Sequence, residues 1–361
     1  MAQAQVRIGI IGCGGIANGK HMPALAKVAE AQMVAFCDIE AERAVKAKET
    51  YGTSDAVVFT DYRELLKDET IEVVHICTPN DSHAEITVAA LEAGKHVLCE
   101  KPMAKTAADA RLMLEAAKRT GKKLSIGYQN RFRADSRYLK EACDREELGE
   151  VYFAKAHAIR RRAVPTWGVF LDEEKQGGGP LIDIGTHALD LALWMMNNYK
   201  PKVVLGRAYH KLSQNENAAN AWGPWDPAQF TVEDSAFAMI TMENGASIVL
   251  ESSWALNSLE VDEAKVTLCG TKAGADMKQG LRINGEENSR LYTKDIELKS
   301  GGVAFYEGAS DDPAELEARA WIDAVLNDKD PVVTPEQALV VSEILEAIYE
   351  SSKTGKAIYF E

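Results

Sequence analysis

The sequence lacks the features of a membrane protein and of a nucleic-acid-binding protein. It has no run of about 18 or more apolar residues, so we expect no membrane-spanning helix. Basic residues are too few to balance the acidic ones, with 41 Lys and Arg against 55 Asp and Glu. The resulting net charge of −14 disfavours nucleic acid and anionic membranes as partners. Internal repeats and low-complexity segments are also absent, and the hydrophobic fraction of 46% is ordinary for a globular protein.

Paired cysteines and a secretory leader are missing as well. The six cysteines are scattered singly, and Cys37, Cys77 and Cys99 each close a short apolar run. This spacing predicts buried free thiols in place of a disulfide framework or a cysteine metal site. Residues 1–12 lead directly into a glycine loop, without the charged start and cleavage site of a secretory signal. We therefore expect a cytoplasmic protein.

The chain length predicts two domains, because 361 residues exceed what one hydrophobic core usually organises. Over residues 1–127, short apolar runs typical of strands buried on both faces alternate with Ala-, Glu- and Lys-rich stretches typical of helices. This alternation predicts a Rossmann domain with a parallel, doubly wound sheet. The expected strands are Val6–Ile11, Met33–Cys37, Val57–Phe59, Val73–Cys77, His96–Glu100 and Leu124–Gly127, and the expected helices are Ala41–Tyr51, Ala84–Ala93 and Ala107–Arg119.

The second domain, residues 128–361, is predicted to be α+β, with a mostly antiparallel, open-faced sheet and helices. The Asn244-Gly245 pair indicates a hairpin, and residues 180–197 form one clear helix. Residues 215–229, rich in Asn, Pro and Trp, predict a long loop that borders the site. The last two helices belong to this domain or pack back on the first. The expected strands are Val151–Arg162, Val203–Leu212, Asp234–Thr241, Ser247–Trp254 and Glu263–Cys269, and the last helices are Pro313–Leu326 and Pro335–Ser351.

A glycine loop follows the first expected strand and opens a helix. It has the pattern G-x-G-x-x-A, in which Gly12 permits a tight turn, Gly14 lets the backbone approach a pyrophosphate, and Ala17 lets the helix pack closely. The helix start offers N–H groups to the phosphates. A tight turn without a ligand is the alternative. We expect the cofactor to contact Gly12, Gly14, Gly15 and Ile16.

Asp38 closes the second expected strand, at a spacing that suits a carboxylate binding the adenosine ribose hydroxyls. A 2′-phosphate beside this carboxylate would be repelled, so the sequence favours NAD over NADP. Arg43 lies near enough in sequence to offer a phosphate partner and leaves NADP as the less favoured cofactor.

Two further segments lie where ligands of a Rossmann sheet bind. Residues 77–83, Cys-Thr-Pro-Asn-Asp-Ser-His, follow the fourth strand, and the alternative to a cofactor role is a capped helix start. Glu100-Lys101-Pro102 ends the fifth strand, where a lysine can donate to a substrate oxygen. A surface lysine beside a turn proline is the alternative. The cofactor contacts expected from these segments are Thr78, Asn80, His83, Glu100 and Lys101.

A second glycine-rich stretch, residues 177–190, opens the clear helix of the second domain. Asp183, His187 and Asp190 are spaced to share one face of an otherwise apolar helix. A buried acid and histidine are costly unless they are paired or used in chemistry. The alternatives are a satisfied core pair and a metal ligand pair. Because no third ligand stands at a telling spacing, no metal is predicted.

Taken together, the motifs GCGGIA, CTPNDSH, CEKP and GGGPLIDIGTHALD resemble those of the Gfo/Idh/MocA oxidoreductases, in the expected order and over nearly the whole chain. The resemblance implies a Rossmann domain followed by an open-faced sheet that forms oligomer contacts. It also implies oxidation or reduction of a carbinol of a sugar, inositol or related ring with NAD or NADP. Carried over by position, Lys101 is similar to the lysine beside the nicotinamide, His187 to the acid–base histidine and Asp183 to its aspartate. Binding of the sugar is further expected, with less support, from Asn130, Arg131, His157, Arg160 and Trp167. For each of them a surface or packing role is an equal alternative, and Asn130 or Arg131 could contact the cofactor instead.

The sequence therefore predicts an NAD-dependent dehydrogenase or reductase of sugars or polyols that assembles as a homodimer or homotetramer through the second-domain sheet. Two other functions remain open. One is an enzyme that keeps NAD tightly bound and oxidises its substrate transiently, with no net redox change. The other is a non-catalytic NAD-binding regulator, which would not need Lys101, Asp183 and His187 together.

Overall fold

The computed structural model describes residues 5–298 and 312–360 and divides the chain into two compact units. One unit comprises Met1–Phe132 and Ser310–Leu339, and the other comprises Arg133–Ala309 and Val340–Glu361. The first unit thus ends at Phe132, where the sequence had suggested Gly127, and it includes a segment from near the end of the chain. We call them the Rossmann unit and the sheet unit. No helix in the described ranges is long and apolar enough to cross a membrane.

The Rossmann unit is built on six strands, all parallel, in the order β3-β2-β1-β4-β5-β6. This is the doubly wound order, with its switch point between β1 and β4, and it confirms the predicted fold class. The strands are β1 Val6–Ile11, β2 Ala31–Cys37, β3 Val57–Phe59, β4 Val73–Ile76, β5 His96–Cys99 and β6 Leu124–Ile126. The helices are η1 Ala17–His21 running into α1 Met22–Leu25, α2 Ala41–Tyr51, α3 Tyr62–Leu66, α4 His83–Glu92, α5 Ala107–Thr120 and α9 Pro313–Leu326, with short turns η2 Asn80–Ser82 and η3 Gln129–Phe132.

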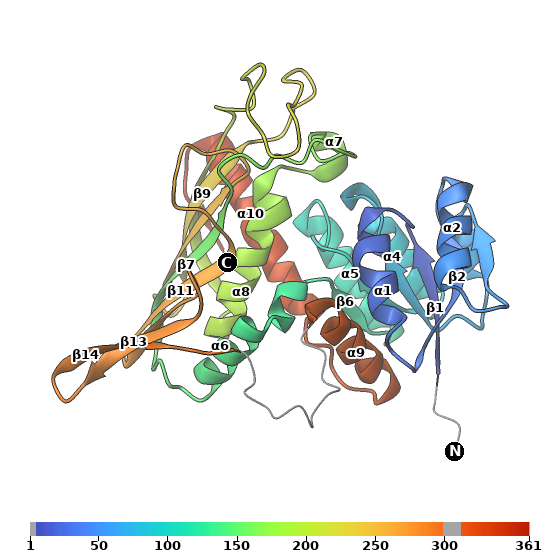
Figure 1. Ribbon diagram of the computed structural model, residues 1–361, viewed down its shortest axis with the longest axis horizontal. Helices are drawn as coiled ribbons and strands as arrows, with labels where there is room; N and C mark the ends of the chain where they lie inside the picture. The colour runs from blue at the N-terminus through green and yellow to red at the C-terminus, as the bar shows by residue number, and fades with distance from the viewer. Residues whose placement is uncertain (1–4, 299–311, 361) are drawn as a thin grey trace. The chain divides into compact units, whose positions relative to one another are not determined.

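Helix α9 joins the Rossmann unit although it lies almost two hundred residues beyond β6 in the sequence. Its Trp321 and Ile322 are buried in the same core as Leu25 and Phe36. Figure 1 shows α9, in brown, beside α1, in blue. The core of this unit is therefore completed by the return of the chain.

Within the described part of the sheet unit, residues 133–298 and 340–360, nine strands form one sheet in the order β14-β13-β12-β11-β7-β10-β9-β8-β15. Every neighbouring pair is antiparallel except β7 and β10, which confirms the predicted mostly antiparallel sheet. The strands are β7 Val151–Ile159, β8 Pro201–Tyr209, β9 Ser235–Met242, β10 Ser247–Ser253, β11 Asp262–Gly270, β12 Ala273–Asp276, β13 Arg282–Glu287, β14 Arg290–Asp295 and β15 Ile358–Tyr359. The helices are α6 Ala134–Asp144, α7 Glu173–Gln176, η4 Leu181–Gly185 running into α8 Thr186–Met196, and α10 Pro335–Thr354, which begins in the Rossmann unit.

One face of this sheet packs on α8 and the other carries polar and apolar side chains together. Ala156 of β7 and Leu250 of β10 are paired and fully buried on the helix side. On the opposite face, Leu205, Met239 and Val249 form a row across three strands, and Leu205 and Met239 are 55% and 51% exposed. The alternation predicted from the sequence therefore gives one buried face and one open face.

Candidate functional site

The glycine loop after β1 is held against the end of β4. Gly12 has a φ of +88°, and a Cβ there would lie 2.7 Å from the carbonyl oxygen of Cys77. By contrast, a Cβ at Gly14 or Gly15 would meet no atom within 4 Å. Gly12 is therefore required by the fold at the switch point, whereas Gly14 and Gly15 leave open space above the loop, as a bound pyrophosphate needs.

Two side chains fix the shape of this loop. Asp38, only 7% exposed, accepts a hydrogen bond from the N–H of Cys13 at 2.8 Å and one from the N–H of Glu40 at 2.9 Å. Asn18 donates through its Nδ2 to the carbonyl oxygens of Cys13 and Gly14, at 2.7 and 2.9 Å. Asn18 was not predicted as a site residue. By occupying carbonyl oxygens that would repel a phosphate, it makes the loop fit a nucleotide.

Arg43, the residue that left NADP open, is already paired. Its Nη2 lies 3.0 Å from Oε1 of Glu40, and both side chains are exposed. The positive charge nearest to Asp38 along the chain is therefore compensated by a neighbouring carboxylate.

His83 lies in the segment after β4, where both of its ring nitrogens contact protein atoms. It is completely buried, and its ring nitrogens lie 2.8 Å from the carbonyl oxygen of Pro102 and 2.9 Å from that of Thr78. The ring thus ties the loop after β4 to the loop after β5, and a cofactor contact of His83 stays a prediction that these contacts do not support. Thr78 and Asn80 stay half-exposed on the same segment and remain predicted contacts.

Glu100 likewise points into the protein. It is 5% exposed, and its Oε1 accepts from Lys20 Nζ and contacts His21 Nε2, both at 2.7 Å, while Oε2 accepts from the N–H of Lys101 at 3.2 Å. Burial alone would raise the pKa of Glu100, but the Lys20 ammonium and the bond to His21 outweigh it and hold the pKa well below its usual value. The carboxylate is thus engaged inside the unit, and a cofactor contact of Glu100 stays a prediction that these bonds do not support.

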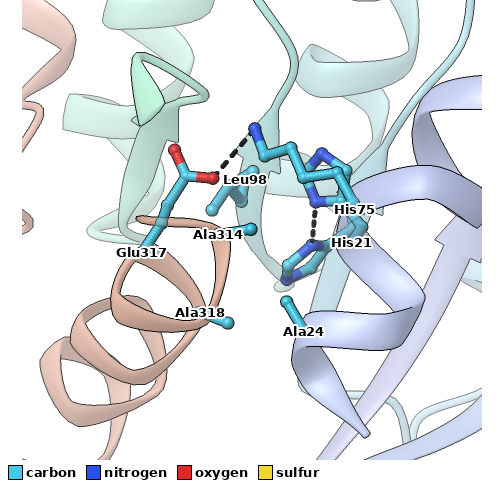
Figure 2. Close-up of a pocket in the computed structure, with 8 residues that line it drawn as sticks. His21, Ala24, His75, Leu98, Ala314, Glu317 and Ala318 are labelled. Atoms are coloured by element: carbon cyan, nitrogen blue, oxygen red, sulfur yellow. Dashed lines mark hydrogen bonds and ion pairs between the residues drawn. The ribbon is translucent and has the colours of Figure 1, made fainter. Parts of the chain in front are cut away.

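Lys20 and His21, the two partners of Glu100 Oε1, also line a cavity of about 10 Å³, roughly the room of one water molecule. Figure 2 shows the residues around this cavity, with His21 and His75 facing each other. His21 and His75 face each other through their Nδ1 atoms at 3.0 Å, and Glu317 of α9 lies 2.9 Å from Lys20 Nζ. This small cavity has no room for a nucleotide. Its charged groups tie α9 to the end of β5, immediately before the half-buried Lys101.

Arg131, predicted to reach the sugar, also has partners within the protein. It is 1% exposed, and its Nη1 donates to the carbonyl oxygen of Val332 at 2.9 Å and to Oε1 of Gln337 at 2.6 Å. Its guanidinium therefore joins η3 to Val332 and to Gln337 of α10, which favours the packing role that the sequence left open, and its sugar contact stays a prediction. Asn130 beside it is half-exposed and remains a candidate.

In the sheet unit, the second glycine stretch is filled by protein. A Cβ at Gly178 would lie 2.0 Å from the Tyr349 hydroxyl, and one at Gly179 would lie 2.2 Å from the carbonyl oxygen of Glu233. The buried Glu233 carboxylate accepts from the N–H groups of Gly179 and Leu181, at 2.8 and 3.0 Å. Tyr349 donates to it at 3.0 Å. Burial raises the pKa of Glu233 to about 7 against these hydrogen bonds.

The predicted catalytic pair of the sheet unit follows directly. Asp183 lies in the π-helical turn η4, half-exposed, and its Oδ2 accepts from the indole Nε1 of Trp254 at 3.0 Å. His187 follows in α8 and is 8% exposed, and Asp190 on the same helix is 1% exposed. A π-helical turn at the head of a helix is a frequent feature of functional sites. The geometry thus presents a carboxylate and an imidazole on one packed helix.

The three weaker candidates of this unit separate. His157 lies on the open face of the sheet, opposite α8, with its nitrogens 3.1 Å from Glu251 and 3.2 Å from Thr267. Both ring nitrogens are thus engaged within the sheet, and the contact of His157 with a sugar stays a prediction that these bonds do not support. Arg160 pairs with Glu263 through two nitrogens, at 2.6 and 2.7 Å, and Trp167 is 51% exposed. Both remain candidates.

Several residues of the site carried no sequence signal strong enough to find them. Lys20 and Glu317 are far apart in the chain, and Glu233 and Tyr349 are joined only by the fold. Within residues 5–298 and 312–360, no group of three or more His, Cys, Asp or Glu side chains is arranged to hold a metal ion.

Comparison with known proteins identifies the two halves of the chain separately. Residues 6–128 match the family model described as an oxidoreductase family with an NAD-binding Rossmann fold. Residues 140–360 match the model for the C-terminal alpha/beta domain of the same family. The chain is 36% identical over 358 residues to D-glucoside 3-dehydrogenase of Escherichia coli, covering 99% of this chain and 98% of that protein. It is 34% identical over 198 residues to inositol 2-dehydrogenase of Salmonella typhimurium, covering 54% and 56%.

Solved structures with the same fold cover almost the whole chain. An oxidoreductase domain protein from Kribbella flavida superposes with a TM-score of 0.86 at 24% identity, covering 99% of this chain and all of the other. A levoglucosan dehydrogenase bound to NADH and L-sorbose superposes with a TM-score of 0.83 at 20% identity, with 99% and 100% covered. Together with both domain models and the full-length relative, these findings show that the chain belongs to the Gfo/Idh/MocA family of oxidoreductases.

Proposed function

We propose that this oxidoreductase transfers a hydride between NAD and a ring carbinol of a glucoside, at carbon 3. The observation that carries the proposal is the similarity to D-glucoside 3-dehydrogenase, which runs the full length of both chains. The similarity to inositol 2-dehydrogenase extends over only about half of each protein, so an inositol is the second candidate substrate.

NAD is the proposed cofactor, with NADP disfavoured. The residues that would hold it are Gly12, Gly14, Gly15 and Ile16 of the loop, Asp38 at the end of β2, and Thr78 and Asn80 after β4. The Asp38 carboxylate suits ribose hydroxyls and repels a 2′-phosphate, and Arg43 is paired with Glu40. When bound, NAD supplies the hydride acceptor for oxidation or, when reduced, the donor for the reverse reaction.

The proposed roles of the side chains follow the family resemblance and the chemistry of each group. His187 accepts the proton of the reacting hydroxyl, which a positioned base accelerates by about 10²–10⁴-fold. Lys101, at the carboxyl end of β5, stabilises the alkoxide that develops on the substrate oxygen. Asp183, held by Trp254, orients a neighbouring hydroxyl or His187.

Label transfer tests the reaction and the carbon together. Methyl glucoside deuterated at carbon 3 is incubated with enzyme and NAD, and the product NADH is analysed by mass spectrometry. We expect deuterium in NADH, whereas the same glucoside deuterated at carbon 2 should give unlabelled NADH as the matched control. Oxidation of inositols with inert glucosides would overturn the proposal in favour of the second candidate.

The spectrum of the purified protein separates the other two mechanisms. Absorbance of reduced nicotinamide in protein freshly isolated, with no net NADH release on adding substrate, would indicate a tightly held cofactor that is re-reduced each cycle. Absence of any sugar turnover, with NAD still bound, would indicate a regulator. The proposed dehydrogenase instead forms NADH steadily and in proportion to substrate.

The open face of the sheet unit is the proposed homo-oligomer interface, in a dimer or tetramer. The row formed by Leu205, Met239 and Val249 leaves two half-exposed apolar side chains side by side on a broad sheet. Apolar surface gathered in this way is typical of contacts between subunits. Light scattering at micromolar concentration should give at least twice the chain mass of 39.5 kDa, and a stable monomer would contradict this proposal.

The cytoplasm remains the proposed location. All six cysteines lie among the described residues and are free, and burial raises the pKa of Cys13 and Cys37 to about 12. Unpaired, protonated thiols fit a reducing compartment.

A further inference from the structure

A chain of aromatic rings leads from Asp183 to the surface of the sheet unit. Trp254, which donates to Asp183, is fully buried, and its ring lies 6.4 Å from Phe170. Phe170 lies 5.9 Å from Trp167, and Trp167 lies 4.9 Å from Trp222. Each of these pairs meets nearly edge to face, at 77°, 72° and 80°. This series of rings thus begins at the buried contact between Trp254 and Asp183 and ends at the two exposed indoles of Trp167 and Trp222.

The two outer rings of this series, those of Trp167 and Trp222, are more exposed than tryptophans of a packed core. Trp167 is 51% exposed and Trp222 is 45% exposed, although each contacts the other. Burial of tryptophan side chains stabilises a fold, so two half-exposed tryptophans in contact with each other are typical of a surface that binds a ligand.

Hydrogen bonds hold the two exposed rings in place. Thr166 donates to the carbonyl oxygen of Trp222 at 2.8 Å, and the side chain of Asn220 bonds both the N–H and the carbonyl oxygen of Val164, at 2.8 and 2.9 Å. Asn220 also donates to Gly223 at 2.8 Å. The loop that carries Trp222 is therefore fastened to the segment that carries Trp167, and the indoles are ordered before any ligand arrives.

The guanidinium of Arg160 also contacts the ring of Trp222. It lies 5.4 Å from the centre of that ring and is fixed by two bonds to Glu263. Although burial opposes it, the contact with Glu263 and the charge of Asp183 raise the pKa of Arg160. Because Arg160 is already engaged by Glu263, the ligand that suits the exposed rings is uncharged and ring-shaped.

We propose that Trp167 and Trp222 form a subsite for the group attached to the oxidised sugar, a neutral ring such as an aryl aglycone or a second pyranose. The inference rests on the proposed function, in which the reacting ring binds at Asp183. Two ring-to-ring contacts, with centroid distances of 6.4 and 5.9 Å, connect Trp254 to Trp167, so the exposed indoles lie beyond the residue that holds Asp183 and not at Asp183 itself. The apolar face of a second ring can then stack on them.

The test compares kcat/KM for methyl and phenyl β-glucosides, with cellobiose as the second-sugar arm. We expect the wild-type protein to favour phenyl glucoside about tenfold, the size of one aromatic contact. Trp222→Ala should remove most of that preference and change methyl glucoside by less than twofold, while Trp222→Phe should keep it. Tyr359→Ala removes an aromatic ring that is 74% exposed on β15 and should leave the ratio intact.

Each outcome decides the proposal. Equal losses on both glucosides, or an unchanged ratio in Trp222→Ala and Trp167→Ala, would overturn the subsite. If neither glucoside is oxidised by the wild-type protein, the proposed function fails, and calorimetric titration of phenyl β-glucoside in the presence of NAD judges the subsite alone. Binding weakened about tenfold in Trp222→Ala would support it, and equal binding or none in the wild type would overturn it. Thermal unfolding and NAD titration of each variant identify any that misfold.

Discussion

The two glycine-rich loops of this protein have the same local design and opposite surroundings. Each opens a helix that contains a π-helical turn near its start, Ala17–His21 in one and Leu181–Gly185 in the other, although the first loop follows strand β1 and the second follows the short helix α7. At Gly14 and Gly15 an added Cβ would meet nothing, whereas at Gly178 and Gly179 it would lie within 2.2 Å of protein atoms. The first loop therefore makes room for a ligand and the second makes room for the protein itself.

The two glycine loops are therefore expected to serve different steps, the first cofactor binding and the second the chemical reaction. The first loop is proposed to present its backbone to the cofactor, so a substitution in this loop should mainly weaken NAD binding. The second loop, clamped by Glu233 and Tyr349, sets the start of the helix that carries Asp183 and His187. A substitution in this second loop should mainly lower the stability of the fold and kcat. NAD titration and thermal unfolding distinguish the two loops without any assumption about the substrate.

The largest effect is expected at the helix that follows the second loop. His187→Ala should lower kcat by about 10²–10⁴-fold, because it removes the proton acceptor, while the Kd for NAD changes little. Lys101→Ala should also lower kcat. The double variant should lose less than the product of the single losses, since the family resemblance assigns both groups to one transition state.

Near-normal turnover in His187→Ala, together with a lower Tm, would make the histidine a core residue. The proposed proton transfer would then be wrong, although the fold and the cofactor site would stand. Losses that multiply fully in the double variant would separate the roles of Lys101 and His187.

The next effect sets the glycines of the two loops against each other. Gly179→Ala should lower the free energy of unfolding by about 4 kcal/mol, because its Cβ would overlap the backbone of Glu233. Gly14→Ala should leave the Tm nearly unchanged and raise the Kd for NAD about tenfold, because its Cβ would occupy the space for the phosphates. Chemical denaturation and NAD titration of both variants measure these outcomes, and a destabilised Gly14→Ala would remove the contrast.

A smaller effect on stability is expected from the pH dependence of Glu233, which holds the second glycine loop together with Tyr349. Burial raises the pKa of Glu233 to about 7 from its ordinary value of 4.5, so its stabilising contribution is complete below about pH 4.5 and is lost as the pH rises through 7. The loss is at most about 3 kcal/mol. The difference in Tm between wild type and Glu233→Gln should therefore change between pH 5 and 8, and a constant difference would refute the raised pKa.

The smallest effect is expected on cofactor binding, from a substitution of Asp38 beside the first glycine loop. Asp38→Ser should weaken NAD binding by about tenfold, or about 1.4 kcal/mol, and should narrow the gap between NAD and NADP. The ratio of kcat/KM for the two cofactors measures it, with Arg43→Ala as the companion variant. A wild-type preference for NADP would contradict the proposed cofactor and point to Arg43 as a phosphate partner.

Local patterns were sufficient wherever neighbouring residues decide the structure. β1, β3 and α2 begin and end where the sequence predicted, and the Asn244-Gly245 turn joins β9 to β10 as expected. The strands β13 and β14 and the helix α6 were not predicted. β14 is exposed along its whole length, so it has no alternation of apolar and polar residues to reveal it. Figure 1 shows β13 and β14 as a hairpin at the edge of the sheet.

The sequence by itself determined the fold class, the glycine loop with Asp38, and the candidates Lys101, Asp183 and His187, because each depends on residue types at short spacing. Only the tertiary structure decided which polar side chains face inward. His83, Glu100 and Arg131 were predicted to meet ligands, yet their partners are the carbonyl oxygens of Thr78, Pro102 and Val332 and the ammonium of Lys20. A buried charge needs a partner, and that partner can come from any point of the chain, so spacing in the sequence cannot reveal it.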